Sequence, residues 1–230
     1  MFLHIKGYAM LDSLQMKLVL KITILLSAVY FGLTVCTVLM APKELTELLY
    51  SESSAYEVFS YWLWGGLALL TLASSMSMRL RVSAATAALL MGARELDMHK
   101  SLFSMSFIKT RFYTSAEITL NEKIIGVTLI ILLLVLAAYL FSKLLQRMRQ
   151  QGLDLSMLLL LIGLSMGVVG KILDRFSSQM RELLNIVVTD EARLMVMALE
   201  ESAEMIMPVI LMIAVLTYND AQKQHKGYGS

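Results

Sequence analysis

Three carboxylates lie inside the last apolar run of this chain, at a depth where lipid would surround the helix. The run 194–218 is long enough to cross a bilayer, and it contains Glu200, Glu201 and Glu204. Inserting one charged side chain at the centre of a membrane helix costs about 2.5 kcal/mol or more. Three such groups on one helix therefore require ionic partners, protons or a bound metal.

Two other apolar segments carry ionisable residues at a matching depth. With a rise of about 1.5 Å per residue and a hydrocarbon core about 30 Å thick, all three groups fall in the outer half of the membrane. Residues four apart share one face of a helix, and three pairs have this spacing. The residues in the other two segments are Arg94, Glu95, Asp97 and His99 in one, and Lys171, Asp174 and Arg175 in the other. The pairs are Glu200–Glu204, Glu95–His99 and Lys171–Arg175.

Carboxylates and a neutral imidazole are suitable ligands for Zn, Mn or Fe, and an open coordination position would activate water. The candidate ligands of such a divalent metal are His99, Glu95, Glu200, Glu204 and Asp174. Glu201 and Asp97 are the candidate catalytic carboxylates, with Asp97 an alternative ligand to Glu95. Three cations, Arg94, Lys171 and Arg175, would neutralise surplus carboxylates or bind an anionic headgroup. No HExxH motif is present.

Two alternative interpretations use the same residues. In the first, the charges form a structural salt-bridge network, with Arg94 paired to Asp97 and Lys171 paired to Asp174. In the second, the carboxylates line a proton or ion pathway. The corresponding functions are a metal-dependent membrane enzyme acting on a lipid or lipid-linked substrate, a small proton- or ion-coupled transporter or channel, and a non-catalytic assembly partner.

The composition predicts how these residues are positioned. Of the 230 residues, 57% are hydrophobic and 17% are charged, and the mean hydropathy is +0.68. Soluble domains have about a quarter charged residues, whereas each membrane-spanning helix needs about 20 mostly apolar residues. We expect an all-α membrane helix bundle forming one integral domain, because only helices or closed barrels satisfy backbone groups in lipid. The six predicted spans are 22–41, 58–78, 82–103, 124–141, 153–173 and 194–218.

Charge asymmetry predicts the topology. Lys and Arg cluster before the first span, between the second and third, between the fourth and fifth, and in the tail, whereas the loop after the first span is acidic. The positive-inside rule then places both termini in the cytoplasm. The loop between the third and fourth spans lies outside in this topology and also carries four basic residues, which weakens the asymmetry.

Packing between the spans is predicted from small and aromatic residues. Gly163, Gly167 and Gly170 form a small-residue face on the fifth span, and the alanine-rich third span is its expected neighbour. An aromatic belt would mark the entry of the second span into the membrane. Its residues are Tyr56, Phe59, Tyr61, Trp62 and Trp64.

The segments ARELDMHK, which contains Glu95 and His99, and LEESAEM resemble a pair of segments in uncharacterised bacterial multi-pass membrane proteins. The resemblance covers about 15 residues and is closest at Glu200, Glu201, Glu204 and Met205. It departs at Lys100, where an acidic residue is commoner. The resemblance implies a bacterial inner (plasma) membrane protein and supplies no activity.

The expected partners follow from the same composition. Membrane lipids would surround the spans, and a second copy of the chain or another membrane subunit would be a further partner. Nucleic acid is not expected, because the chain has no basic arm with interleaved aromatic residues.

Overall fold

A computed structural model describes residues 2–51, 54–96, 103 and 105–227. Every regular element in this described part is an α-helix, which confirms the predicted all-α class. The helices group into two units. Unit 1 comprises residues 1–56 and 154–218, and unit 2 comprises residues 57–153 and 219–230.

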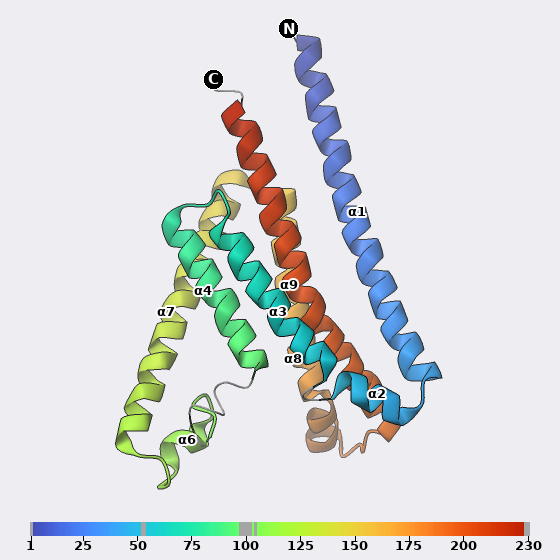
Figure 1. Ribbon diagram of the computed structural model, residues 1–230, viewed down its shortest axis with the longest axis vertical. Helices are drawn as coiled ribbons and strands as arrows, with labels where there is room; N and C mark the ends of the chain where they lie inside the picture. The colour runs from blue at the N-terminus through green and yellow to red at the C-terminus, as the bar shows by residue number, and fades with distance from the viewer. Residues whose placement is uncertain (1, 52–53, 97–102, 104, 228–230) are drawn as a thin grey trace. The chain divides into compact units, whose positions relative to one another are not determined.

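Unit 1 is built from three long helices and one short helix (Figure 1). Its helices are α1 (Phe2–Met40), α2 (Lys43–Tyr50), α8 (Leu155–Leu184) and the part of α9 (Asp190–Gly227) up to Tyr218. Helix α9 runs antiparallel to α8, since Gly163 faces Leu211 whereas Gly170 faces Glu204. It is also antiparallel to α1, which it meets at Thr34 and Ser202 (Figure 1). Its core contains Leu159, Ile206 and Ile210, with α1 side chains packed against them.

Unit 2 contains most of α3 (Ala55–Leu72), together with α4 (Met78–Glu95), α6 (Thr110–Thr114) and α7 (Leu120–Gln151). Helix α4 contacts α7. A small aromatic core of Phe103, Phe107 and Phe112 closes over the start of α7, where a Cβ added at Gly126 would meet the Phe112 ring at 2.9 Å.

Capping residues explain why two helices begin where they do. Thr119 and Glu122 form a reciprocal capping box that satisfies the first backbone N–H groups of α7. The Asp154 carboxylate accepts a hydrogen bond of 2.7 Å from the backbone N–H of Met157, which caps α8. Both helices extend well beyond the predicted apolar runs, because polar turns continue the helical hydrogen bonding.

Three helices of the described chain are long and apolar enough to cross a membrane, by length and composition alone. These candidate spans are Lys17–Met40, Leu120–Gln150 and Leu155–Leu184, and they contain the predicted runs 22–41, 124–141 and 153–173 apart from a few terminal residues. The prediction of six spans is not supported for the runs 58–78, 82–103 and 194–218. Helix α3 ends at Leu72, and its tyrosine and tryptophan residues lower its mean hydropathy. Helix α9 contains three glutamates in its apolar run.

The third predicted span is too long. Helix α4 ends at Glu95, and the backbone N–H of Leu96 bonds back to the Gly92 carbonyl at 3.2 Å. The predicted site residues Asp97 and His99 lie outside the described residues.

The prediction that Trp64 belongs to an exposed aromatic belt is wrong. Trp64 is only 3% exposed, and its Cβ lies close to Gly92 of α4. In contrast, Trp62 and Phe59 are 66% and 55% exposed, as expected for side chains at an interface.

Candidate functional site

The glycine face of α8 is filled by α9, and not by the third predicted span as the sequence suggested. A Cβ added at Gly163 would lie 2.8 Å from Leu211 Cδ2, and one at Gly167 would lie 2.9 Å from Met207 Sδ. At Gly170 the added Cβ would meet Glu204 Cγ at 3.2 Å. The two helices therefore approach closely along a line that ends at the predicted carboxylates.

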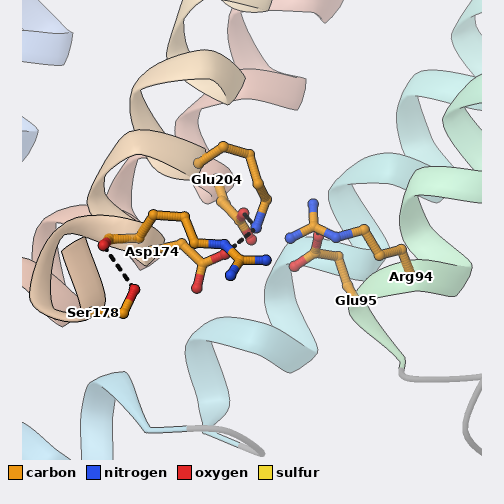
Figure 2. A network of polar contacts seen from close by, with 7 residues as sticks. Arg94, Glu95, Asp174, Ser178 and Glu204 are labelled. Atoms are coloured by element: carbon orange, nitrogen blue, oxygen red, sulfur yellow. Dashed lines mark hydrogen bonds and ion pairs between the residues drawn. The ribbon is translucent and has the colours of Figure 1, made fainter. Parts of the chain in front are cut away.

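An ion pair bridges the two helices at the end of this line. The Lys171 ammonium lies 3.3 Å from Glu204 Oε1 and 3.2 Å from Asp174 Oδ2 (Figure 2). Because Asp174 follows Lys171 by one helical turn, the lysine can hold both carboxylates at once. The Lys171–Asp174 pair is the one that the salt-bridge interpretation predicts. We call Gly163, Gly167, Gly170, Lys171, Asp174 and Glu204 the α8–α9 seam.

Burial differs sharply among the charged groups of the seam. The Glu204 side chain is 12% exposed, whereas the side chains of Lys171 and Asp174 are 49% and 41% exposed. The Lys171 side chain is therefore half exposed on the surface of α8, and its ammonium contacts a carboxylate that protein atoms largely enclose. Arg175, one turn beyond Lys171, is exposed, and its backbone carbonyl accepts a hydrogen bond from Ser178 Oγ (Figure 2).

Glu204 faces α8, and the backbone carbonyl of Glu200 lies on the same side, 3.9 Å from the position of a Cβ at Gly170. Glu201 is close enough to the Tyr30 phenol on α1 to interact with it electrostatically. Residues 200 and 204 share a helix face, as the spacing predicts, and residue 201 is offset from it.

Helix α1 meets α9 through a buried polar contact that the sequence analysis did not identify. Thr34 Oγ1 lies 2.8 Å from Ser202 Oγ, and the two residues are 2% and 0% exposed. The phenol of Tyr30 is one turn away from Thr34 on α1. The sequence signal was weak, because small hydroxyl residues such as these are common within apolar runs.

A second contact links α9 to the start of α2. Lys43 Nζ lies 3.1 Å from Glu191 Oε1, with both side chains more than half exposed. Such an exposed pair contributes at most about 1 kcal/mol.

The remaining predicted site residues belong to unit 2. Arg94 Nη1 lies 3.5 Å from Glu95 Oε1, and the Glu95 side chain is 6% exposed (Figure 2). The salt-bridge interpretation paired Arg94 with Asp97, a residue outside the described part. Glu95 and the α9 glutamates belong to different units, so their predicted convergence stays a prediction.

Among the described residues, no group of three His, Cys, Asp or Glu side chains is arranged to hold a metal ion. In the seam, the ammonium of Lys171 lies between the carboxylates of Asp174 and Glu204, at the position that a metal ion would take. The predicted metal set included His99, so the divalent-metal prediction remains untested. No family model, curated protein or solved structure matches this chain.

Proposed function

We propose that this chain is an integral protein of a bacterial inner membrane that moves protons or small cations by way of the α8–α9 seam. The observation that carries the proposal is the position of Lys171, whose ammonium lies between the carboxylates of Glu204 and Asp174 on a candidate membrane-spanning helix. Ionisable groups within membrane helices are rare, and they mark ion pathways and proton relays.

The proposal includes the finer topology that the sequence predicts. In it α9 also crosses the membrane, since the charge of Glu204 is offset by Lys171 and its side chain is enclosed by α8. If α3 and α4 cross the membrane as well, the chain has six spans, and both termini lie in the cytoplasm. The Lys and Arg clusters on alternate loops support this orientation.

The seam supplies a plausible chemistry for ion exchange. Lys171 has two carboxylate partners at almost equal distance, one on its own helix and one on α9. When Glu204 accepts a proton or a cation, the lysine charge remains compensated by Asp174. The site can therefore load and release a positive charge without leaving an ammonium group unpaired, which would be costly in a medium of low dielectric constant.

Proton flux into liposomes tests the proposal. Purified protein is reconstituted with a pH-sensitive dye inside the vesicles, and an imposed pH gradient starts the reaction. We expect Glu204→Gln to lower the flux about tenfold or more, because the amide cannot carry a proton. Glu182→Gln is the matched control, because Glu182 is an exposed carboxylate on the same helix as Lys171. Wild-type vesicles no more permeable to protons and alkali cations than protein-free vesicles would refute the proposal.

The metal-dependent lipid enzyme is the competing prediction. Metal analysis of the purified wild type, Glu200→Gln and His99→Ala would test it. Stoichiometric metal in the wild type, lost in both variants, would support that enzyme in place of a proton or cation pathway.

A further inference from the structure

One end of unit 2 is formed by three segments that are far apart in the sequence. Helices α4 and α7 contact each other and run antiparallel within the unit, so the α3–α4 turn lies at the same end as the last turns of α7 (Figure 1). The end of α9 joins them, because Asn219 Oδ1 accepts hydrogen bonds of 2.8 Å from the backbone N–H and 3.0 Å from the hydroxyl of Ser75. We call residues 73–81, 139–150 and 219–223 the basic end of unit 2.

Positive charge dominates the basic end. Its Lys and Arg residues are Arg79, Arg81, Lys143, Arg147, Arg149 and Lys223. Within the three ranges, Asp220 is the sole acidic residue. The opposite end of the unit, around α6 and the start of α7, mixes both signs. Its charged residues in the range 109–123 are Lys109, Arg111, Glu117, Glu122 and Lys123. The excess of positive charge is therefore concentrated at one end of unit 2.

The Arg81 guanidinium is held over the α3–α4 turn by uncharged groups. Its Nη1 lies 3.4 Å from the backbone carbonyl of Leu72 and 3.3 Å from that of Ser74, and its Nη2 lies 3.6 Å from Met78 Sδ. These contacts fix the side chain but do not neutralise its charge. Arg79, in the first turn of α4, is exposed. The turn thus presents two guanidinium charges beside the last turns of α7.

Helix α7 places its basic residues at the depth of lipid headgroups. It is a candidate membrane span, and its apolar run 124–141 is about 27 Å long at about 1.5 Å per residue. This length is close to the thickness of the hydrocarbon core, about 30 Å. The basic residues begin directly after the run, at Lys143, whose Nζ lies 5.9 Å from the centroid of the Tyr139 ring. Tyrosine and lysine at the end of an apolar run are typical of the membrane–water interface.

We propose that the basic end of unit 2 binds the phosphate groups of anionic phospholipids such as phosphatidylglycerol. Charge complementarity favours an anion, and clusters of about four to eight Lys and Arg next to a membrane helix are typical of sites for anionic lipids. The apolar surface beside the cations favours a lipid over a free ion, because Leu134, Val135 and Phe141 of α7 are 64%, 62% and 59% exposed. Acyl chains would cover these side chains while the phosphate contacts the basic residues. The site shares the membrane location of α7 with the proposed function but does not depend on ion movement.

Native mass spectrometry of the full chain in detergent tests this site, because it counts the lipids bound to each protein. Phosphatidylglycerol and zwitterionic phosphatidylcholine are titrated separately, and inorganic phosphate is added as a competitor. The test variant Arg79→Gln/Arg149→Gln removes two exposed charges of the basic end. Lys109→Gln/Arg111→Gln is the matched control, because it removes two exposed charges from the opposite end of the same unit. Arg79→Lys/Arg149→Lys keeps the charge and changes only the shape of the cation.

We expect the wild type to prefer phosphatidylglycerol, and Arg79→Gln/Arg149→Gln to weaken its binding about tenfold or more, since each cation near an anionic lipid surface contributes about fivefold. The lysine variant should lose less, and the control should bind like the wild type. Equal binding of the two lipids, an equal loss in the control, or full displacement of the lipid by inorganic phosphate would overturn the proposal.

Lipid binding and ion movement are measured separately. A wild type that binds phosphatidylglycerol as expected but carries no proton flux would refute the proposed function and leave the lipid site standing. Flux without a preference for phosphatidylglycerol would do the reverse.

Discussion

The Lys171 ammonium on α8 lies 3.3 Å from Glu204 Oε1 on α9, and this ion pair joins two antiparallel helices at the end of a glycine face. The carboxylate is largely enclosed, whereas the lysine is half exposed. Such a pair can serve as a structural contact, and in the proposed function it is also the exchangeable site. The two roles make different predictions.

Removing the lysine charge should destabilise the α8–α9 contact. We expect Lys171→Met to lower the free energy of unfolding by about 1–3 kcal/mol, because the enclosed Glu204 loses a charged hydrogen-bond donor. Thermal unfolding in detergent at neutral pH measures the effect. Lys171→Glu combined with Glu204→Lys should recover part of the loss. A double variant less stable than both single variants would contradict a stabilising ion pair between residues 171 and 204.

The glycine face of α8 predicts that Gly→Ala substitutions lower the stability of the protein by different amounts at different positions. Gly163→Ala should be the most disruptive of the three seam substitutions, because the new Cβ would lie 2.8 Å from Leu211 Cδ2 and 3.0 Å from its Cγ. Overpacking of this kind costs about 1–3 kcal/mol. Gly167→Ala should cost less, since the Met207 thioether that it meets is flexible.

Gly32→Ala on α1 is the control for this series, because an added Cβ there has no neighbour within 4 Å. Thermal unfolding should place Gly32→Ala at or above the wild type, as helix propensity favours alanine over glycine. Leu211→Ala should be less destabilising in the Gly163→Ala background than in the wild type, because the added methyl group fills part of the space that the leucine leaves. An unaltered melting temperature for Gly163→Ala alone would contradict the close approach of α8 and α9.

Charges inside apolar runs stand out in the sequence, and they drew attention to Lys171, Asp174 and Glu204, which form ion pairs in the structure. Their predicted role as metal ligands or charge-neutralising groups stays a prediction. The neighbour of the glycine face was predicted wrongly, since glycine spacing shows that a helix approaches but does not show which one. Helix ends were also predicted poorly. Polar turns extend α8 to Leu184, whereas α4 stops at Glu95 although no proline or glycine follows at once.

The contact between α1 and α9 could not be predicted from the sequence. Thr34 and Ser202 are separated by most of the chain, and hydroxyl residues within apolar runs are common.

Reporter fusions test the proposed topology. A fusion after Ser51 should be active on the periplasmic side, because the preceding loop is acidic, and one after Gln151 should be active in the cytoplasm, because three basic residues precede it. Alkaline phosphatase and a cytoplasmic fluorescent protein report the two sides. The reverse pattern at both positions would invert the topology, and the same compartment at both would change the number of spans between them.

Alkaline pH should destabilise the cluster of tyrosines at the end of α2. Burial and the hydrogen bond with Tyr50 raise the pKa of Tyr56 above its ordinary value of 10. A raised pKa means that the fold favours the neutral phenol. The corresponding stability is complete below the unfolded-state pKa and is lost as pH rises from there through the higher folded-state pKa.

Melting temperatures measured from neutral pH to strongly alkaline pH check this prediction. The wild type should lose stability as pH rises above about 10. Tyr56→Phe should lose less over that range, although below it the variant lacks a hydrogen bond worth about 0.5–1.5 kcal/mol. Tyr139→Phe should follow the wild type. If Tyr56→Phe and the wild type show the same alkaline decline, Tyr56 does not contribute to it.

Chemical labelling of protonated carboxyl groups tests the central claim most directly. A hydrophobic carbodiimide reacts with carboxylic acids in apolar surroundings, and peptide mass spectrometry locates the adduct. An exchangeable seam predicts labelling of the α9 peptide that contains Glu204, loss of that label in Glu204→Gln, and loss of proton flux in step with modification. Exposed Glu182 should remain unlabelled. Labelling confined to exposed carboxylates, or complete modification of Glu204 with unchanged flux, would contradict the account.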